Sequence, residues 1–464
     1  MLLDKEIKQI CIELSNKKEI KDSKQKSIIH KFKNQWLDIM TEANLYNKLY
    51  NTYSLNNLEI TEYGIKGQIY KVPPLTYDKL QKNIDIIEEN LGCCIILNNE
   101  KGSKWINSKF VFNQNKGKKF KIVEEKCPYK VYLSNDYSGN PILADLRKHP
   151  HILITGTTRS GKSKLADCVI TNLVNNCTPK DLQLYLFQVA KNDLCLYEDL
   201  EHTMAFADTL DKTLIALNYI NDVIVPQRNE LIKPYRKKAI LDNIWEYNDL
   251  KKTEKYPMIL LCFDEMASIF QTKGDPSCIK DMKDEITRNI QNISQYGASL
   301  GIFLLSSIQR PTMDMLPPFI KSQSNTIISL RQANSRSSEV ATDDAKLALG
   351  LKQREFVYKL DEWDYGLVPL VDNKEIYNYI KPFLKPNHRT LFDDLEKLKN
   401  RDGIKKNKEK VEAKSNFKTE NEILEENISK INDFVPYDNH NGMIIKEDKP
   451  VIKTEKSKGM VKVK

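Results

Sequence analysis

One stretch decides the fold of this chain, Gly156-Thr157-Thr158-Arg159-Ser160-Gly161-Lys162-Ser163, which fits the phosphate-binding pattern G-x-x-x-x-G-K-[ST]. The apolar run Ile152-Leu153-Ile154 precedes it, and apolar residues with helical spacing follow it at Leu165, Val169, Ile170 and Leu173. A strand, a glycine-containing loop and a helix in this order are the context that the pattern requires. The stretch therefore predicts a P-loop, and a glycine-containing loop without function is the weaker interpretation.

Each part of such a loop has a role in binding a nucleotide. Glycines let the backbone wrap the phosphates with its N–H groups pointing inward, and the N-terminus of the following helix favours negative charge. We expect Lys162 to reach the β and γ phosphates and the Ser163 hydroxyl to ligate Mg²⁺. The predicted ligands are ATP and Mg²⁺.

A second apolar run, Ile259-Leu260-Leu261-Cys262-Phe263, ends in two acids, Asp264 and Glu265. The carboxylates then lie at the C-terminal edge of the sheet, where α/β proteins bind ligands. This is typical of a Walker B element, in which Asp264 holds Mg²⁺ through water and Glu265 orients or deprotonates the attacking water. The alternative, an Asp-Glu pair that only caps the next helix, is weakened by the P-loop about a hundred residues earlier.

A third apolar run, Ile302 to Ile308, delivers Gln309 and Arg310 to the same edge of the sheet. A polar group at that position can sense the γ-phosphate. The alternative is that Gln309 only satisfies hydrogen bonds of the loop backbone.

The order of apolar and polar stretches predicts the domain organisation. Strand-like runs at 152–154, 184–187, 258–263, 302–305 and 326–330 alternate with helical stretches, which favours an α/β fold with a mainly parallel sheet. We expect a helical segment at 1–55, a small α+β domain at 56–128, a P-loop ATPase domain at 129–385 and a lysine-rich disordered tail at 386–464, with one helix near 420–431. In the α+β domain a single helix should begin after Thr76 and end at Gly92.

Composition limits the class of protein only weakly. Lys and Arg number 72 against 63 Asp and Glu, a formal net charge of +9, which is compatible with nucleic acid but equally with lysines that solvate the surface. The nine dispersed cysteines suggest neither a zinc site nor a disulfide framework. No run approaches the roughly 18 apolar residues of a membrane span. We expect a cytoplasmic protein, with any membrane attachment supplied by a partner.

Residues 129 to about 370 resemble the motor domain of the FtsK/SpoIIIE family, including the coupling proteins of Gram-positive conjugative elements. The similar stretches are Gly139 to Leu146, Lys148 to Gly156, the P-loop, the strand ending at Asp264 and Glu265, and Gly301 to Pro311. The α+β unit before Tyr129 is similar in outline to the smaller ring-forming domain of the family. The resemblance implies a RecA-like P-loop motor in a homo-hexameric ring, with double-stranded DNA in the channel and ATP at the subunit boundaries.

The resemblance also suggests residues for contacts beyond one subunit. Family members carry an arginine after the third strand, and Arg336 in Asn334-Ser335-Arg336 is similar, so it could stabilise transition-state charge on the ATP of a neighbouring subunit. The alternative is a surface arginine at the start of a helix. Lys273, Lys280 and Lys283, which follow the Walker B strand, are candidates for DNA contacts or, equally, solvated lysines.

The chain departs from the family at two motifs. The acidic-Pro-Lys element after the second strand reads Gln188-Val189-Ala190-Lys191, which retains only the lysine. The helix before Gly301 reads Gln295-Tyr296-Gly297-Ala298 and lacks the expected arginine. No winged-helix pattern for reading DNA sequence is evident.

Three functions are compatible with these features. The first is an ATP-driven DNA translocase that works in the transfer or segregation of a plasmid, phage or integrative element. The second is an ATP-regulated DNA-binding coupling scaffold that recruits a relaxase or replication protein without processive movement. The third is a virion packaging ATPase, which would ordinarily bring a nuclease domain. Glu265 favours hydrolysis, because a pure switch does not need a poised base.

Overall fold

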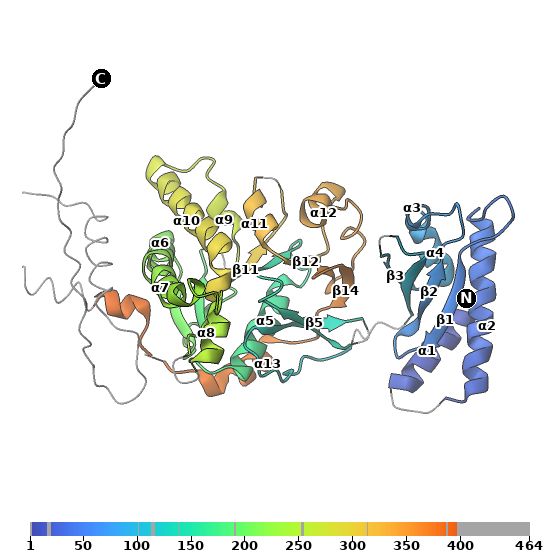
Figure 1. Cartoon of the computed structure of the whole chain (residues 1–464), viewed down its shortest axis with the longest axis horizontal. Coiled ribbons are helices and arrows are strands. Elements are labelled where there is room, and N and C mark those ends of the chain that lie inside the picture. The colour runs from blue at the N-terminus through green and yellow to red at the C-terminus, as the bar shows by residue number, and fades with distance from the viewer. Residues whose placement is uncertain are drawn as a thin grey trace, which may run out of the picture. The chain divides into compact units, whose positions relative to one another are not determined.

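The computed structural model describes residues 2–15, 20–100, 102–112, 117–137, 139–189, 192–251, 255–312, 314–386 and 388–396. The expected disordered tail therefore lies outside the described residues from 397 onward, as does the helix expected near 420–431. Lys191, the retained lysine of the family element, also lies outside them. Figure 1 shows the described elements in colour.

The N-terminal unit combines helices with an antiparallel sheet of strand order β1-β2-β4-β3. Its elements are α1 (Leu2–Ser15), α2 (Asp22–Glu42), β1 (Ser54–Ile60), β2 (Gly64–Tyr70), α3 (Tyr77–Gln81), α4 (Ile84–Leu91), β3 (Cys94–Asn98) and β4 (Trp105–Val111). Helices and sheet share one hydrophobic core, in which the ring centroids of Phe32 and Phe110 lie 4.9 Å apart. The buried Trp36 indole donates to the Tyr53 carbonyl at 2.7 Å. The first two helices are thus packed onto the strands that follow them.

The helix expected between Thr76 and Gly92 is correct at its ends and wrong in its middle. The Thr76 hydroxyl accepts the N–H of Lys79, and Gly92 ends α4 in the left-handed conformation with φ 67°. Between them the helix breaks into α3 and α4. The Asn83 side chain donates to the Lys79 carbonyl at 2.8 Å, and such a local bond offers the backbone an alternative to continuing the helix.

The second sheet contains ten strands in the order β6-β5-β14-β13-β12-β7-β11-β10-β8-β9. The parallel group is β7 (Ile152–Thr155), β8 (Leu182–Phe187), β9 (Thr203–Ala207), β10 (Met258–Phe263), β11 (Ile302–Ile308) and β12 (Thr326–Leu330). An antiparallel extension follows from β12, formed by β5 (Lys130–Asp136), β6 (Pro141–Asp145), β13 (Glu355–Lys359) and β14 (Trp363–Leu367). The predicted α/β fold with a mainly parallel sheet is confirmed.

Helices cover both faces of this sheet, because residues of the central strands alternate between two hydrophobic cores. In β10, Met258, Leu260 and Cys262 pack with α5 (Lys162–Asn176) and α13 (Asn373–Ile380). Ile259, Leu261 and Phe263 pack on the opposite face. The helices there are α6 (Leu210–Tyr219), α7 (Val225–Arg236), α8 (Ile244–Leu250), α10 (Ser277–Tyr296) and α11 (Pro318–Gln323) (Figure 1). A strand buried on both faces in this way reads as a continuous apolar run.

The remaining helical elements are short and connect these layers. They are α9 (Ala267–Phe270), α12 (Ser335–Thr342), the 3₁₀ turns at Cys195–Tyr197, Ala298–Leu300 and Lys381–Phe383, and one π-helical turn at Ile220–Ile224. Two of them, α9 and α12, follow the C-terminal ends of β10 and β12. They therefore begin at the edge of the sheet where the predicted site residues lie.

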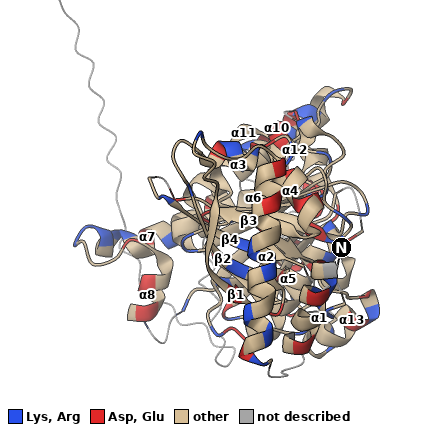
Figure 2. Cartoon of the chain, turned by 90° about the vertical axis from the view of Figure 1, so that its right-hand side faces the viewer, with Lys and Arg blue, Asp and Glu red and all other residues tan. Residues whose placement is uncertain are grey.

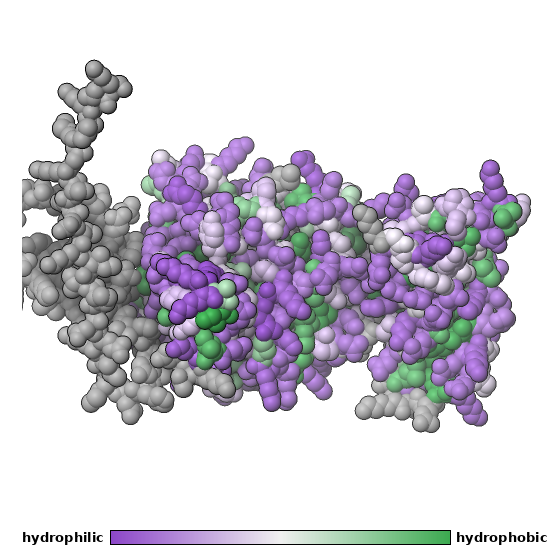
Figure 3. Space-filling view, in the orientation of Figure 1, coloured by the Kyte–Doolittle hydropathy of each residue, from purple (hydrophilic) through white to green (hydrophobic). Residues whose placement is uncertain are grey.

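Basic, acidic and apolar residues are mixed over the surface. In the view of Figure 2, α2 carries lysines together with acidic residues, so the positive net charge is not concentrated there. The face shown in Figure 3 is mostly hydrophilic, with apolar residues gathered near α1, whose Ile12 is 45% exposed. Within the described part of the chain, no helix combines the length and the hydropathy needed to cross a membrane.

His151, at the start of β7, makes the stability of the sheet depend on pH. Its Nδ1 accepts the N–H of Leu304 at 3.1 Å, so Nε2 carries the proton and donates to the Ser294 carbonyl at 2.9 Å. Burial lowers the pKa of His151 to about 4, because the charged ring is poorly solvated there. The unfolded chain, with its ordinary pKa near 6.5, therefore takes up the proton first as the pH falls.

We expect the free energy of unfolding to decrease between pH 6.5 and 4, by roughly 3 kcal/mol in total from this group. The variant His151→Asn should show a flatter dependence over this range, because the asparagine does not titrate and tolerates the φ of 60° found at this position. Urea unfolding at pH 4.5, 5.5, 6.5 and 7.5 measures the effect. The exposed His30→Asn is the control, and an equal slope for His151→Asn and wild type would contradict the assignment.

Candidate nucleotide site

The predicted P-loop connects β7 to α5, and its backbone has the conformation that the glycines permit. Gly156 has φ 149° and Gly161 has φ 118°, both in a region that favours glycine. A Cβ atom at Gly156 would lie 2.9 Å from both Leu330 Cβ and Ser160 Oγ, so a larger residue would not fit. The loop can therefore curve around a phosphate at the N-terminus of α5.

Contacts with two neighbouring strands hold this loop in place. The N–H and the hydroxyl of Thr157 both donate to the carbonyl of Arg331, directly after β12, at 3.0 and 3.1 Å. The hydroxyl of Thr158 donates to Oε1 of Gln309, directly after β11, at 3.3 Å. The middle of the loop is held from the other side, since its Ser160 carbonyl accepts the N–H of Arg354 at 2.8 Å. The loop is thus preorganised by the surrounding strand ends.

Lys162 and Glu265 lie together at the C-terminal edge of the sheet. The Nζ atom of Lys162 is 3.9 Å from Oε2 of Glu265, and the two side chains are only 5% and 10% exposed. The other carboxylate oxygen of Glu265 accepts the N–H of Gln309 at 3.0 Å. Gln309 therefore contacts both the P-loop, through its side chain, and Glu265, through its backbone. The structure brings the three predicted motifs into one site.

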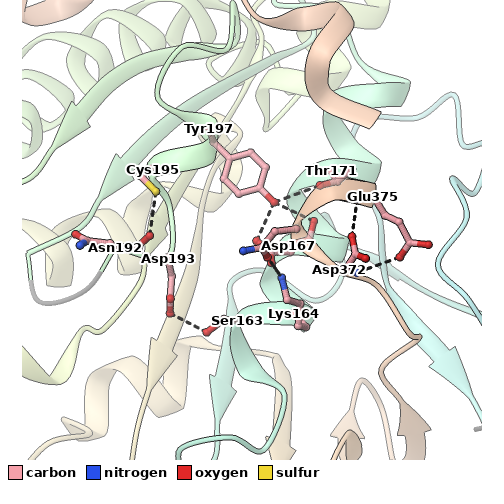
Figure 4. Close-up of polar contacts among 11 residues, drawn as sticks. Ser163, Lys164, Asp167, Thr171, Asn192, Asp193, Cys195, Tyr197, Asp372 and Glu375 are labelled. Atoms are coloured by element: carbon pink, nitrogen blue, oxygen red, sulfur yellow. Dashed lines mark hydrogen bonds and ion pairs between the residues drawn. The ribbon is translucent and has the colours of Figure 1, made fainter. Parts of the chain in front are cut away.

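Ser163 and Asp264 line a small cavity of about 20 Å³ beside the P-loop. Asp264 is buried, with 6% exposure, and its N–H donates to the Phe187 carbonyl at the end of β8 at 3.2 Å. The Ser163 hydroxyl donates to Oδ2 of Asp193 at 2.7 Å (Figure 4). Hydroxyl and carboxylate oxygens are the donors that Mg²⁺ takes in nucleotide sites. These residues fit a Mg²⁺-bound nucleoside triphosphate whose phosphates lie in the P-loop.

A hydrogen-bonded cluster fastens α5 behind the P-loop. The buried Tyr197 hydroxyl donates to Oδ1 of Asp167 at 2.9 Å and lies 3.2 Å from the Thr171 hydroxyl (Figure 4). Lys164 donates to the other oxygen of Asp167 at 2.9 Å. Burial raises the pKa of Asp167, and the Lys164 ammonium opposes that shift. Asp167 therefore serves to hold α5 against the 3₁₀ turn at Cys195–Tyr197.

The residues predicted for contacts beyond one subunit differ in their surroundings. Arg336 is exposed in the first turn of α12, which Asn334 caps by accepting the N–H of Ser337. Lys273 and Lys280 are exposed. Lys283 is 9% exposed, and its ammonium donates to the Gln271 carbonyl and to Oδ2 of Asp275, both at 2.8 Å. Lys283 is thus engaged in fastening α10 to the loop before it, whereas the other two lysines face solvent.

Two residues at the site were not predicted from the sequence. The first is Asp193, which supplies the carboxylate at this edge of the sheet. The resemblance would place an acid at Gln188, but the Gln188 side chain is turned into the loop after β8. The feature of the sequence that could have indicated Asp193 is an acidic residue shortly after a buried strand. The second residue is Arg354, whose left-handed backbone, with φ 73°, lies against the P-loop and whose Nε donates to the Val368 carbonyl at 2.8 Å. A charged residue before a short strand gave no signal for that role.

The sequence model of the FtsK/SpoIIIE family matches residues 114–346, half of the chain. The chain belongs to the FtsK/SpoIIIE family. The matched range contains the P-loop, the Asp264-Glu265 strand, Gln309 and Arg336, so the FtsK/SpoIIIE domain includes the three predicted motifs. This confirms the resemblance inferred from the motifs and the P-loop ATPase class of the fold.

The DNA translocase FtsK of Helicobacter pylori strain J99 is 30% identical over 229 residues, which cover 49% of this chain and 26% of that protein. The FtsK of Campylobacter jejuni strain NCTC 11168 is 31% identical over 223 residues, 47% of this chain and 22% of that protein. The region of this chain that matches thus spans about a quarter of the length of these curated relatives.

Among solved structures, the conjugation coupling protein TcpA of pCW3, in its monomer form with ATPγS, aligns with a TM-score of 0.53 and 21% identity. The alignment covers 76% of this chain and 99% of that one. At this level of identity the similarity concerns the fold. It extends beyond the range of the family model and supports the α/β architecture over most of the chain.

Proposed function

We propose that this chain is an ATP-driven translocase that moves double-stranded DNA, with the nucleotide site described above as its motor. The single observation that carries the proposal is the Glu265 carboxylate, 10% exposed and 3.9 Å from the P-loop lysine in an FtsK/SpoIIIE domain. A protein that only binds ATP needs the lysine but not a poised carboxylate. The homologues named as DNA translocases supply the substrate class.

In this proposal each residue of the site has a separate task. Lys162 contacts the β and γ phosphates, and Ser163 and Asp264 hold Mg²⁺, which when bound neutralises charge that develops on the phosphates. Glu265 aligns the attacking water and accepts its proton. Gln309 contacts both the P-loop and Glu265, so a change at the γ-phosphate would alter both of its contacts.

The same proposal includes a hexameric ring with DNA in its channel, as the family resemblance implies. The exposed Arg336 would reach the nucleotide of a neighbouring subunit and stabilise charge there. Lys273 and Lys280, both exposed beyond the Walker B strand, would contact DNA phosphates. A role in the transfer or segregation of a mobile element fits the structural similarity to a coupling protein.

We expect duplex DNA to stimulate ATP hydrolysis and to bind without sequence preference, because contacts with phosphate supply most of the affinity of non-specific DNA binding. The double variant Lys273→Ala/Lys280→Ala should bind DNA more weakly, with a salt dependence lower by about one in log–log slope for each lysine removed. Both effects are measured from ATPase rates and DNA affinities at salt concentrations between about 50 and 200 mM. Over this range counterion release changes the affinity strongly. The exposed pair Lys180→Ala/Lys237→Ala is the matched control.

The second candidate, a DNA-binding coupling scaffold that recruits a relaxase or replication protein, makes a different prediction. Such a scaffold would bind ATP and DNA but hydrolyse ATP slowly, and DNA would not stimulate the hydrolysis. A basal rate that duplex DNA leaves unchanged, in protein shown to bind that DNA, would therefore contradict the translocase and favour the scaffold. If the two double variants show equal salt slopes of DNA binding, Lys273 and Lys280 do not contact DNA.

A further inference from the structure

Asp193 faces the P-loop from a part of the chain that none of the three motifs includes. It lies six residues beyond the end of β8, and its carboxylate accepts the hydroxyl proton of Ser163 at 2.7 Å (Figure 4). Both residues line the small cavity that Asp264 also lines. A carboxylate therefore contacts the hydroxyl that the P-loop supplies for the metal.

The loop that carries Asp193 is anchored directly after it. Oε1 of the buried Gln188 accepts the N–H of Leu194 at 2.7 Å. The Leu194 side chain is buried in the core with α5, and Tyr197 donates to Asp167 within α5. Because these anchors come from the sheet and from α5, Asp193 is held in a fixed place relative to Ser163. A surface carboxylate that met the hydroxyl by chance would not need such support.

The other nearby acid, Asp167, is already engaged. Its two carboxylate oxygens accept hydrogen bonds from Tyr197 and Lys164, and it is 6% exposed. Asp193 is exposed, and its contact in the site is with Ser163. Of the two acids that line the cavity on this side, Asp193 is therefore the one whose carboxylate addresses the metal-binding hydroxyl.

A serine hydroxyl has one proton to donate and two lone pairs that can accept. When the proton is donated to Asp193, the lone pairs are directed elsewhere and the oxygen becomes a better donor to a cation. Partners of this kind orient metal ligands and raise their basicity, and their loss typically lowers metal affinity by about 10–100-fold. Resting on the proposed nucleotide site, we propose that Asp193 is the positioning residue of Ser163, which it prepares to bind Mg²⁺.

The test separates nucleotide binding from metal binding. Equilibrium binding of a fluorescent ATP analogue is measured in EDTA and then over a titration of Mg²⁺. For Asp193→Ala we expect nucleotide affinity in EDTA to stay close to that of wild type, since the hydrogen bond of Asp193 is to the Ser163 hydroxyl and not to the P-loop backbone. The Mg²⁺ concentration that gives half of the gain in affinity should rise by about 10–100-fold. Because Asp193 is exposed, this variant should fold, and its melting temperature checks this.

Two further variants show whether Asp193 acts through Ser163. In a double-mutant cycle, Asp193→Ala should have almost no additional effect on the Mg²⁺ midpoint when Ser163 is already alanine. Glu198→Gln removes an exposed carboxylate from the same loop and should match wild type.

The inference is wrong if Asp193→Ala leaves the Mg²⁺ midpoint unchanged, or if its effect persists in full in the Ser163→Ala background. Wild-type protein that does not bind the nucleotide at all would instead contradict the proposed function. The two failures are therefore distinguishable.

Discussion

Replacing Glu265 with glutamine is expected to lower steady-state ATP hydrolysis by about 10²–10⁴ while leaving nucleotide binding nearly intact. Glutamine keeps the size of the side chain and one oxygen that can still accept the N–H of Gln309, as Glu265 does at 3.0 Å. It removes the charge that aligns and activates water. The lysine and the metal-binding residues are unchanged, so the variant should retain ATP and accumulate in the ATP-bound form on DNA.

The neighbouring acid provides the matched comparison. Asp264→Asn should weaken the Mg²⁺-dependent part of nucleotide binding as well as turnover, because Asp264 lines the cavity beside Ser163 whereas Glu265 lies beside Lys162. Binding and hydrolysis are measured on both variants at the same Mg²⁺ concentration. Hydrolysis by Glu265→Gln at the wild-type rate would show that the base lies elsewhere. Identical binding and hydrolysis in the two variants would contradict the separate roles of the two acids.

The second large effect is expected for Lys162→Ala. A hydrogen bond to a charged group contributes about 1.5–3 kcal/mol, so losing the phosphate contact should weaken ATP binding by roughly 10–150-fold and abolish measurable turnover. The change also takes away the cation 3.9 Å from Glu265. Isothermal titration with a non-hydrolysable ATP analogue gives the affinity, and single-turnover hydrolysis at saturating ATP gives the rate.

Lys180→Ala is the control for this variant, since Lys180 is an exposed lysine just beyond the other end of α5. The melting temperature of Lys162→Ala should stay close to that of wild type, because the lysine belongs to neither of the two hydrophobic cores that cover the sheet. Wild-type affinity together with wild-type turnover in Lys162→Ala would overturn the assignment of the P-loop.

The sequence predicts the parallel part of the sheet well, because each central strand is buried on both faces and reads as an apolar run flanked by a turn. The antiparallel extension is different. The strands β13 and β14 are short and are less buried at one end, so their sequences resemble those of loops. Their place depends on pairing with β12 and with β5, and β5 lies more than two hundred residues earlier in the chain. Pairing over such a distance has no local pattern.

The same distinction separates the predicted from the unpredicted site residues. Lys162, Asp264 and Glu265 belong to motifs whose spacing to a strand fixes their position. Asp193 lies in a loop, and its direction is set by a glutamine side chain and by a tyrosine bonded to a different helix. Lys283 is the opposite case, a residue that the sequence suggested for DNA contacts. Its ammonium is instead bound to Gln271 and Asp275, which the pattern of charge after β10 did not reveal.

The pairing of β14 with β5 joins two strands that lie more than two hundred residues apart in the chain. Gly366 lies opposite Asp136 and Leu367 opposite Asn135, and the Ser134 hydroxyl donates to the Leu367 carbonyl at 3.1 Å. During synthesis, by the same geometry, β5 and β6 must wait as a hairpin for almost the whole domain to be made before the sheet can close beside them.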